Sequence, residues 1–144
     1  MKNGFTVTTD LNDMDFHVIH QFISHSYWAK GMPEQTLRKA LANSLCFGVL
    51  NENGEQVGFA RMITDSATFA YLADVFILEA YRGKGLSKWL VANIMDHAEL
   101  QGLRRIMLAT RDAHGLYRQF GFNDVSQEEA SMLMQIRDPD VYLR

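Results

Sequence analysis

A glycine-containing turn is the first segment whose residue types could do chemistry. The turn RGKGLS (residues 82–87) follows a long, mostly apolar stretch, residues 69–78, and precedes a helical pattern. The first backbone N–H groups of a helix lack internal partners and carry partial positive charge, and glycine lets an anion approach them closely. The turn therefore predicts a pyrophosphate site, to which Lys84, Lys88 and the Ser87 hydroxyl add contacts. A plain turn into an amphipathic helix with solvated lysines explains the same residues, and both interpretations are open at this point.

Two side chains are candidates for proton transfer. Tyr117 lies in a predicted short helix, residues 113–120, and a phenol with an ordinary pKa of about 10 can serve as an acid; a core tyrosine is the structural alternative. Asp74 interrupts the apolar stretch YLADVFI. Burial disfavours an ionised carboxylate and so suits it to act as a base. The alternative is a structural aspartate bonded to the backbone or to an arginine such as Arg61.

The elements that position these residues follow from hydrophobic periodicity and turn residues. The predicted strands are residues 5–9, 46–50, 56–63, 69–78, 105–110 and 131–136. The predicted helices are residues 14–24 with Asn12 or Asp13 as cap, a segment that begins at Pro33 and contains Leu37 to Leu45, residues 83–99 ended by Gly102, and residues 113–120. The order β-α-α-β-β-β-α-β-α-β predicts one α/β (α+β) domain over residues 1–144, with a mixed, mostly antiparallel sheet flanked by helices.

Composition narrows the function classes. The chain has 144 residues, 47% hydrophobic and 22% charged, which is enough for one sizeable core. The net charge of -3 argues against a broad nucleic-acid binder. Cys46 is the one cysteine, so an internal disulfide and a multi-cysteine metal cluster are excluded, and no metal site is predicted. We expect a cytoplasmic protein, because neither a signal peptide nor a membrane-spanning run is visible.

The two motif segments together resemble the GNAT family of N-acetyltransferases. That family carries [Q/R]-x-x-G-x-[G/A] between its fourth strand and third helix, and a Y-x-x-x-G-F-like element downstream. The corresponding residues are Arg82, Gly85 and Ser87 in the first motif and Tyr117 with Gly121-Phe122 in the second. Ser87 departs from the usual Gly or Ala, but it is small. The resemblance covers residues 5 to 125 and is weakest over residues 13 to 45, where members vary with substrate.

The resemblance implies acetyl-CoA as cosubstrate. Its pyrophosphate would bind the backbone of the glycine turn, and its pantetheine arm would pair like an extra strand with the end of the fourth strand. Thr110 stands where many members have an asparagine that contacts the cofactor. The cofactor-binding residues implied are Val75, Phe76, Ile77, Arg82, Gly83, Lys84, Gly85, Leu86, Ser87, Lys88 and Thr110.

The resemblance also implies roles in catalysis. Tyr117 corresponds to the general acid that protonates the leaving thiolate, and Asp74, or Tyr71 through a bound water, is a candidate base. His25, Tyr27 and Trp28 occupy the variable substrate wall, although the two aromatic residues could instead cap the core.

The function implied is direct transfer of an acetyl group to a primary amine; the acceptor expected is a small molecule, and a peptide or protein amine is the alternative. We expect no nucleic-acid or membrane partner, and a homodimer is an open expectation. The alternative is a non-catalytic acyl-CoA-binding or regulatory module of the same fold.

Overall fold

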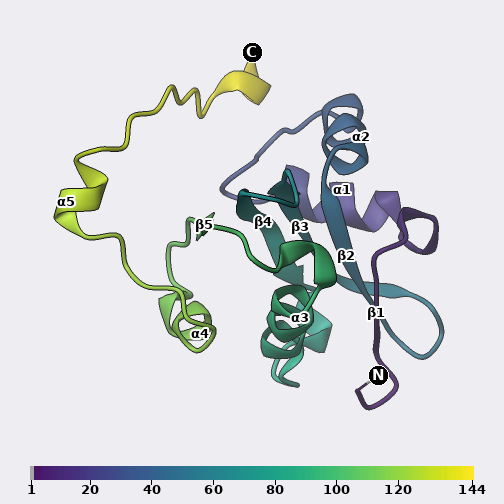
Figure 1. Ribbon diagram of the computed structural model, residues 1–144. Coiled ribbons are helices and arrows are strands. Elements are labelled where there is room, and N and C mark those ends of the chain that lie inside the picture. Colours follow the sequence, from purple (N-terminus) through teal and green to yellow (C-terminus); the bar gives the residue numbers. More distant parts are fainter. Residues whose placement is uncertain (1) are drawn as a thin grey trace.

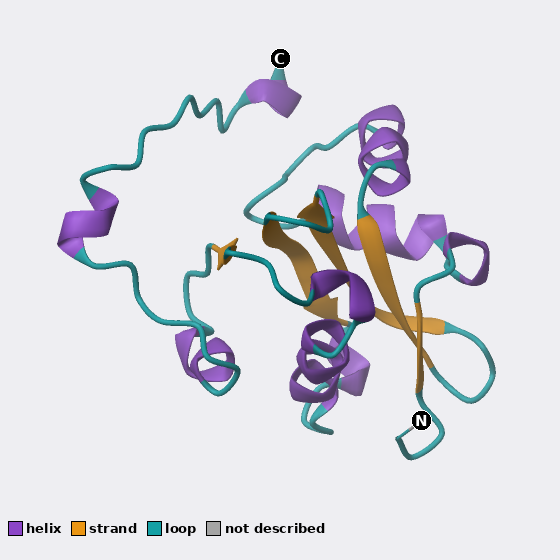
Figure 2. Cartoon of the chain, in the orientation of Figure 1, coloured by secondary structure: helices purple, strands orange, loops and turns teal. Residues whose placement is uncertain are grey.

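The computed structural model describes residues 2–144, and its centre is a five-stranded sheet with helices on both faces (Figure 1). The strands lie in the order β1-β2-β3-β4-β5; the first four are antiparallel to their neighbours, and β5 runs parallel to β4 (Figure 2). This arrangement confirms the predicted mixed, mostly antiparallel sheet. The strands are β1 (Thr6–Thr8), β2 (Leu45–Leu50), β3 (Gln56–Thr64), β4 (Phe69–Ile77) and β5 (Arg105–Leu108).

Two hydrophobic clusters, one on each face of the sheet, hold the helices. The cluster of α1 (Phe16–Ser24) and α2 (Glu34–Ala42) contains Ile19, Ile23, Leu37 and Leu41, which lie four residues apart on the inner face of each helix. The other cluster joins the inner side chains of α3 and Tyr117 to the opposite face. The helices are α1 (Phe16–Ser24), α2 (Glu34–Ala42), α3 (Leu86–Met95), α4 (His114–Arg118) and α5 (Gln127–Ala130), with 3-10 turns at Leu11–Asp13, Glu79–Tyr81, Ala98–Leu100 and Val141–Leu143.

Two predicted helix boundaries were wrong. The cap of α1 is Asp15, whose Oδ1 accepts from the Val18 N–H at 3.3 Å, because Asn12 and Asp13 are taken up in a preceding 3-10 turn. The third helix runs only from Leu86 to Met95. It cannot begin at residue 83, because Gly83 and Gly85 have φ near +80°, outside the helical region.

A β-bulge in β4 changes which face its side chains occupy. Phe59 pairs with Phe76, but Arg61, two residues further on β3, pairs with Ala73, three residues back on β4. The extra residue in β4 accompanies a positive φ of 57° at Asp74. Leu72 and Ile77 consequently belong to the α3 cluster, whereas Phe76 belongs to the opposite one. The face of a residue in β4 therefore depends on which side of Asp74 it lies.

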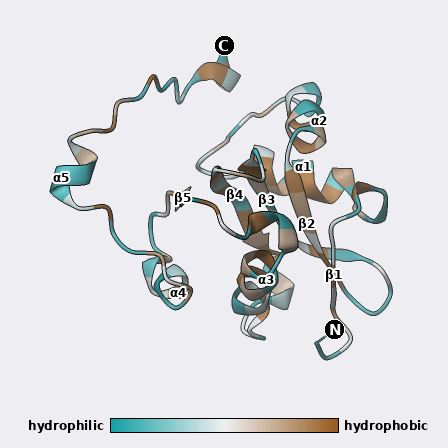
Figure 3. Ribbon diagram, in the orientation of Figure 1, coloured by the Kyte–Doolittle hydropathy of each residue, from teal (hydrophilic) through white to brown (hydrophobic). Residues whose placement is uncertain are grey.

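The predicted last strand at residues 131–136 was wrong. Residues 127–130 form α5, and residues 131–136 follow it outside the sheet as a turn and an irregular segment, with Leu133 lining a groove beside β5 (Figures 1 and 3). Within residues 2–144, no strand pairs with residues 131–136, so their backbone has no ladder partner there. The chain then returns to the body, where Tyr142 packs against the α1–α2 cluster.

Candidate functional site

The end of β4 lies open on the side away from β3. β4 pairs with β5 only from Phe69 to Leu72, and beyond that point it continues to Ile77 alongside β3 alone. The Leu78 N–H donates to the Val57 carbonyl at 2.8 Å, so the alternation of the strand turns the peptide groups of Ile77 away from β3. The open side offers the Ile77 N–H, which has no strand partner, to an extended, amide-containing ligand, while the Ile77 carbonyl accepts from Arg82 Nε.

The three predicted residues of this strand end contribute backbone more than side chains. Phe76 is buried and stacks on Phe22, with ring centroids 4.0 Å apart, and Ile77 is buried in the α3 cluster. Val75 is partly buried against the same cluster. Their apolar side chains are explained by packing, so recognition is left to the peptide groups that do not face β3; those of Phe76 face its partner Phe59.

The glycine turn leads from this open edge directly into α3. Arg82 Nε donates to the Ile77 carbonyl at 2.9 Å and so fixes the turn to the end of β4. Gly85, with φ of 77°, is the N-terminal cap residue of α3 and provides no side-chain cap bond. The first N–H groups of a ten-residue helix are therefore free of a side-chain cap.

The remaining predicted residues of the turn differ in their exposure to solvent. Leu86 is buried in the α3 cluster and anchors the helix start, and Ser87 is half-buried. Gly83, Lys84 and Lys88 are exposed and accessible to an anion. This arrangement suits a pyrophosphate group, since backbone N–H groups, a helix dipole and two cations share one end of the helix.

Tyr117 of α4 faces the sheet with its ring buried. The residue is 8% exposed, and its ring packs edge-on against Phe122, with centroids 5.8 Å apart. Buried side-chain polar atoms without a hydrogen-bond partner are absent from residues 2–144, and no bond involves the phenol oxygen there, so this oxygen keeps some exposure to solvent. Burial raises the pKa of Tyr117, and the neighbouring Tyr27 phenol raises this pKa further. The phenol therefore stays protonated at neutral pH, as a proton donor must.

Asp74 sits at the centre of a buried polar cluster. Its Oδ2 lies 2.6 Å from Arg61 Nε, and its Oδ1 accepts from Trp28 Nε1 at 2.7 Å. Arg61 also donates to the Ser44 hydroxyl at 3.2 Å. The Asp74 side chain is only 3% exposed. Both carboxylate oxygens are thus engaged, and the bulge of β4 is tied to the loop between α1 and α2.

Aromatic side chains from that loop form a wall beside Tyr117. Tyr27 and Trp28 meet edge-to-face with centroids 5.1 Å apart, and the Arg111 guanidinium lies 3.8 Å from the Tyr27 ring centroid. Tyr27 and Trp28 remain 57% and 43% exposed, so both rings can still contact a ligand. Of the predicted wall residues, Trp28 is bonded to Asp74, and Tyr27 lies near enough to Tyr117 to raise the pKa of its phenol.

Two predicted residues have local roles in the structure. His25 follows α1, and its Nδ1 lies 2.8 Å from the Gln21 carbonyl oxygen, which directs the ring to the end of its own helix. The Thr110 hydroxyl accepts from the Ala113 N–H at 3.0 Å and so orders the turn into α4. The cofactor contact of Thr110 stays a prediction.

Sequence reasoning missed Arg111 as part of this wall. The Arg111 side chain stacks on Tyr27, which lies 84 positions earlier in the chain. A single sequence contains no signal for such a contact. Phe22, which connects Phe76 to Trp28, was likewise not predicted as a site residue.

Further findings concern metals and membranes. Among residues 2–144, no three His, Cys, Asp or Glu side chains converge in a way that could hold a metal ion. None of the helices in this part of the chain has the length and apolar character needed to cross a bilayer.

Comparison with known proteins gives consistent matches. The model of the "Acetyltransferase (GNAT) family" matches residues 11–122. A Gibberella zeae protein named "Putative acetyltransferase" is 35% identical over 146 residues, covering 85% of this chain and 81% of that protein. A crystal structure from Xanthomonas campestris, described as belonging to the GNAT family, is 47% identical with a TM-score of 0.90 and covers 96% of both chains.

A more distant relative has a named acceptor. The ribosomal protein bS18-alanine N-acetyltransferase of Haemophilus influenzae is 32% identical over 81 residues, which cover 53% of this chain and 53% of that enzyme.

Proposed function

The chain belongs to the GNAT family of acetyltransferases, and we propose that it transfers an acetyl group from acetyl-CoA to a primary amine by direct attack within a ternary complex. One observation supports the proposal most strongly: β4 stops pairing with β5 after Leu72, next to the glycine turn that leads into α3. A pantetheine arm and a pyrophosphate group require these two features side by side. The residues present therefore fit the cosubstrate.

The chain's own groups would bind the cosubstrate in two places. The backbone of Val75, Phe76 and Ile77 would pair with the amides of the pantetheine arm. The N–H groups of residues 83–88, with Lys84 and Lys88, would hold the pyrophosphate. Because the side chain of Phe76 packs in the core, substitution there would report on folding rather than on binding.

Tyr117 would donate the proton that the reaction needs. The amine nitrogen attacks the thioester carbon, a C–N bond forms, the C–S bond breaks, and the leaving sulfur takes a proton from the phenol. With ordinary pKa values of about 10 and 8.5, this proton transfer is uphill by about 2 kcal/mol, and the raised pKa of Tyr117 adds to that. The cost is small beside the total barrier reduction that enzymes achieve.

The proton of the acceptor must also leave. A lysine-like amine with a pKa of about 10.4 is neutral only about once in a few thousand molecules at pH 7, a deficit of about 4–5 kcal/mol. The base role of Asp74 stays a prediction, and it requires the carboxylate to give up a bond to Arg61 or Trp28. We therefore propose that water carries the proton away and that Asp74 holds Trp28 in the acceptor wall.

Cys46 is not needed for this chemistry. The thiol is buried under α2, and burial raises its pKa to about 11, so it stays protonated at neutral pH. This also helps the assay, because a buried, protonated thiol contributes little background when released CoA is measured with a thiol reagent.

Calorimetry with acetyl-CoA, followed by a thiol-release screen, tests the proposal. The amine panel should contain polyamines, amino acids, aminoglycosides, aryl amines and peptides with free N-termini, including an N-terminal alanine. Turnover of at least one amine is expected. Binding of acetyl-CoA without turnover of any amine would instead support the non-catalytic module, and absence of binding would contradict both.

A further inference from the structure

Arg111 contacts the acceptor wall, which consists of Tyr27 and Trp28, from the other side of the candidate site. It follows β5 and precedes Tyr117 by six positions, so the β5 side of the site carries it. Tyr27 belongs to the β4 side, because it packs on Trp28, which is bonded to Asp74 of β4. The 3.8 Å contact between the Arg111 guanidinium and the Tyr27 ring therefore joins the two sides, past the last pair of the β4–β5 ladder.

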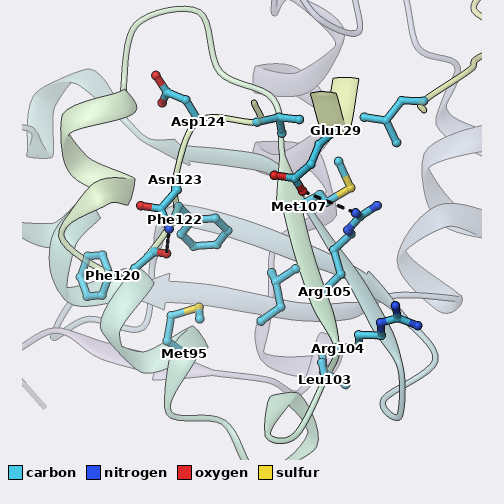
Figure 4. A pocket seen from close by; sticks show the side chains of 14 residues that line it. Met95, Leu103, Arg104, Arg105, Met107, Phe120, Phe122, Asn123, Asp124 and Glu129 are labelled. Atoms are coloured by element: carbon cyan, nitrogen blue, oxygen red, sulfur yellow. Dashed lines mark hydrogen bonds and ion pairs between the residues drawn. The ribbon is translucent and has the colours of Figure 1, made fainter. Parts of the chain in front are cut away.

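The Arg111 guanidinium is held in place, but its charge has no anionic partner. Within residues 2–144 it forms neither an ion pair nor a hydrogen bond, whereas Arg105 of β5 pairs with Glu129 at 3.9 Å (Figure 4). With the guanidinium carbon so close to the Tyr27 centroid, an edge-on approach would push a nitrogen into the ring, so the guanidinium lies face-on. Its N–H donors then point outward in its own plane, and the side chain is exposed. Such a planar fork matches the paired oxygens of a carboxylate or a phosphate.

The charge of Arg111 lies at the acceptor end of the proposed site rather than at the phosphate end. Asp74, which anchors the wall, precedes Ile77 by three residues, about 10 Å along an extended strand, and the glycine turn lies beyond Ile77. A pyrophosphate bound at the turn would therefore lie at the far end of the pantetheine arm from Arg111. A cation at the acceptor end repels polyamines and aminoglycosides, which carry several positive charges, and attracts an acceptor with an anionic group.

We propose, on the premise that acetyl transfer is the function, that the acceptor amine also carries a carboxylate or phosphate group and that Arg111 binds this anion through paired N–H donors. The Tyr27 contact fixes the guanidinium beforehand, so less side-chain freedom is lost on binding. The exposed parts of Tyr27 and Trp28 would contact the carbon chain between the anion and the amine. The same positive charge favours the neutral form of a nearby amine, which is the form that attacks the thioester.

Paired acceptors that differ only in the anion test this proposal by thiol release. The pairs are alanine with alaninamide, and 2-aminoethyl phosphate with 2-aminoethanol. Within at least one pair, kcat/KM should be about tenfold or more higher for the anionic member, and the pair concerned identifies the anion. The amine chemistry alone favours the uncharged member, because loss of the anion leaves more of its amine neutral. A preference for the uncharged members, or for polyamines or aminoglycosides, overturns the proposal.

Variants of Arg111 separate anion binding from a structural role. Arg111→Gln should lower the ratio of kcat/KM between the anionic and uncharged members about 10- to 100-fold, and Arg111→Lys, which keeps the charge without the planar fork, should lower it less. A structural role alone would lower both kcat/KM values and leave their ratio unchanged, which would refute the proposal. Arg38→Gln is the matched control, because it removes a guanidinium 3.7 Å from the Phe16 ring, outside the site, and should not change the ratio.

Two further readouts keep this proposal distinct from the proposed function. The dissociation constant of acetyl-CoA should be the same for Arg111→Gln and the unmodified protein in calorimetry; a tenfold rise would assign Arg111 to the cosubstrate phosphates and overturn its role toward the acceptor. Melting curves check that the variants fold, as expected for exposed side chains. Turnover confined to amines without an anionic group would contradict the role of Arg111 alone, whereas absence of turnover with every amine would contradict the proposed function and this inference together.

Discussion

Breaking the ion pair between Arg61 and Asp74 should destabilise the protein strongly. The Asp74 side chain is 3% exposed and the Arg61 side chain 13% exposed, so water can compensate for neither charge. Removing one partner of a buried pair costs about 3–5 kcal/mol, because the other charge is left uncompensated. Arg61→Met leaves the carboxylate with the Trp28 N–H alone, and we expect a loss of about 3 kcal/mol.

The partner substitution should be Asp74→Asn. Asp74 has a φ of 57°, and asparagine tolerates this left-handed conformation better than other side chains of similar size do. Its amide oxygen can still accept from Trp28 Nε1. The variant therefore removes the charge while leaving the bulge and the tryptophan contact intact, and the double variant Arg61→Met/Asp74→Asn removes the charge pair without leaving an unpaired ion.

Urea titration and thermal melting of the four proteins measure the coupling. For a chain of this size, about 2–4 °C is lost per kcal/mol, so Arg61→Met should melt about 6–12 °C lower. The double variant should recover part of that loss, with a coupling energy of about 2–3 kcal/mol. A coupling energy below about 1 kcal/mol, typical of an exposed pair, would refute the reasoning. The kcat of Asp74→Asn also decides the base: a drop of about 100-fold or more indicates proton transfer by Asp74, and a drop of less than tenfold indicates positioning.

Other predictions concern the acid, the turn and the wall. Tyr117→Phe should lower kcat about 100-fold or more with an unchanged acetyl-CoA dissociation constant; an unchanged kcat would remove its role. The pKa of Tyr117 is raised and the phenol acts while protonated. The pH–rate profile of kcat/KM should therefore show no decline on the alkaline side until the pH exceeds about 10, and a decline near pH 8 would contradict this. Gly85→Ala and the control Gly54→Ala both put a side chain at φ near +78°, so each should lower the free energy of unfolding by about 1 kcal/mol in urea titration. Only Gly85→Ala should weaken acetyl-CoA binding in calorimetry, by about tenfold or more. Trp28→Phe keeps a ring but loses the donor to Asp74, so the KM for the amine should rise and stability should fall by about 1 kcal/mol, whereas an unchanged KM would place the amine elsewhere.

Local patterns in the sequence were enough to predict most of the sheet and its helices. The stripe of Ile19 and Ile23 and the stripe of Leu37 and Leu41 predict which faces of α1 and α2 are buried, because helical periodicity depends only on near neighbours. The glycine turn predicted the start of α3 to within three residues, and φ values near +80° explain the difference. The prediction of a strand at residues 131–136 failed for the opposite reason. The segment SMLMQI has the composition of a strand, but whether a strand forms depends on a partner strand that the local pattern does not reveal.

Much of the candidate site depends on contacts between distant parts of the chain. Asp74 was conspicuous in the sequence because a carboxylate interrupts an apolar strand, and an arginine partner at position 61 was one of its two interpretations. Its bond to Trp28 joins residues 46 positions apart, and the stacking of Arg111 on Tyr27 spans more. Residue types therefore indicated which groups could react, while only the fold shows which of them meet.

The bulge at Asp74 connects the architecture of the sheet to the architecture of the site. Without the extra residue, Leu72 and Phe76 would share a face, and one of the two clusters would lose a large side chain. With it, both clusters are filled, and past Leu72 the strand runs along β3 alone, so the edge that the cosubstrate would use is unpaired. The same residue holds the loop of Tyr27 and Trp28 through its carboxylate. Because Asp74 carries the bulge beside the open end of β4 and also holds the loop of the proposed acceptor wall, a change at Asp74 that keeps the left-handed backbone separates these two effects, whereas a change that abolishes it disturbs both together.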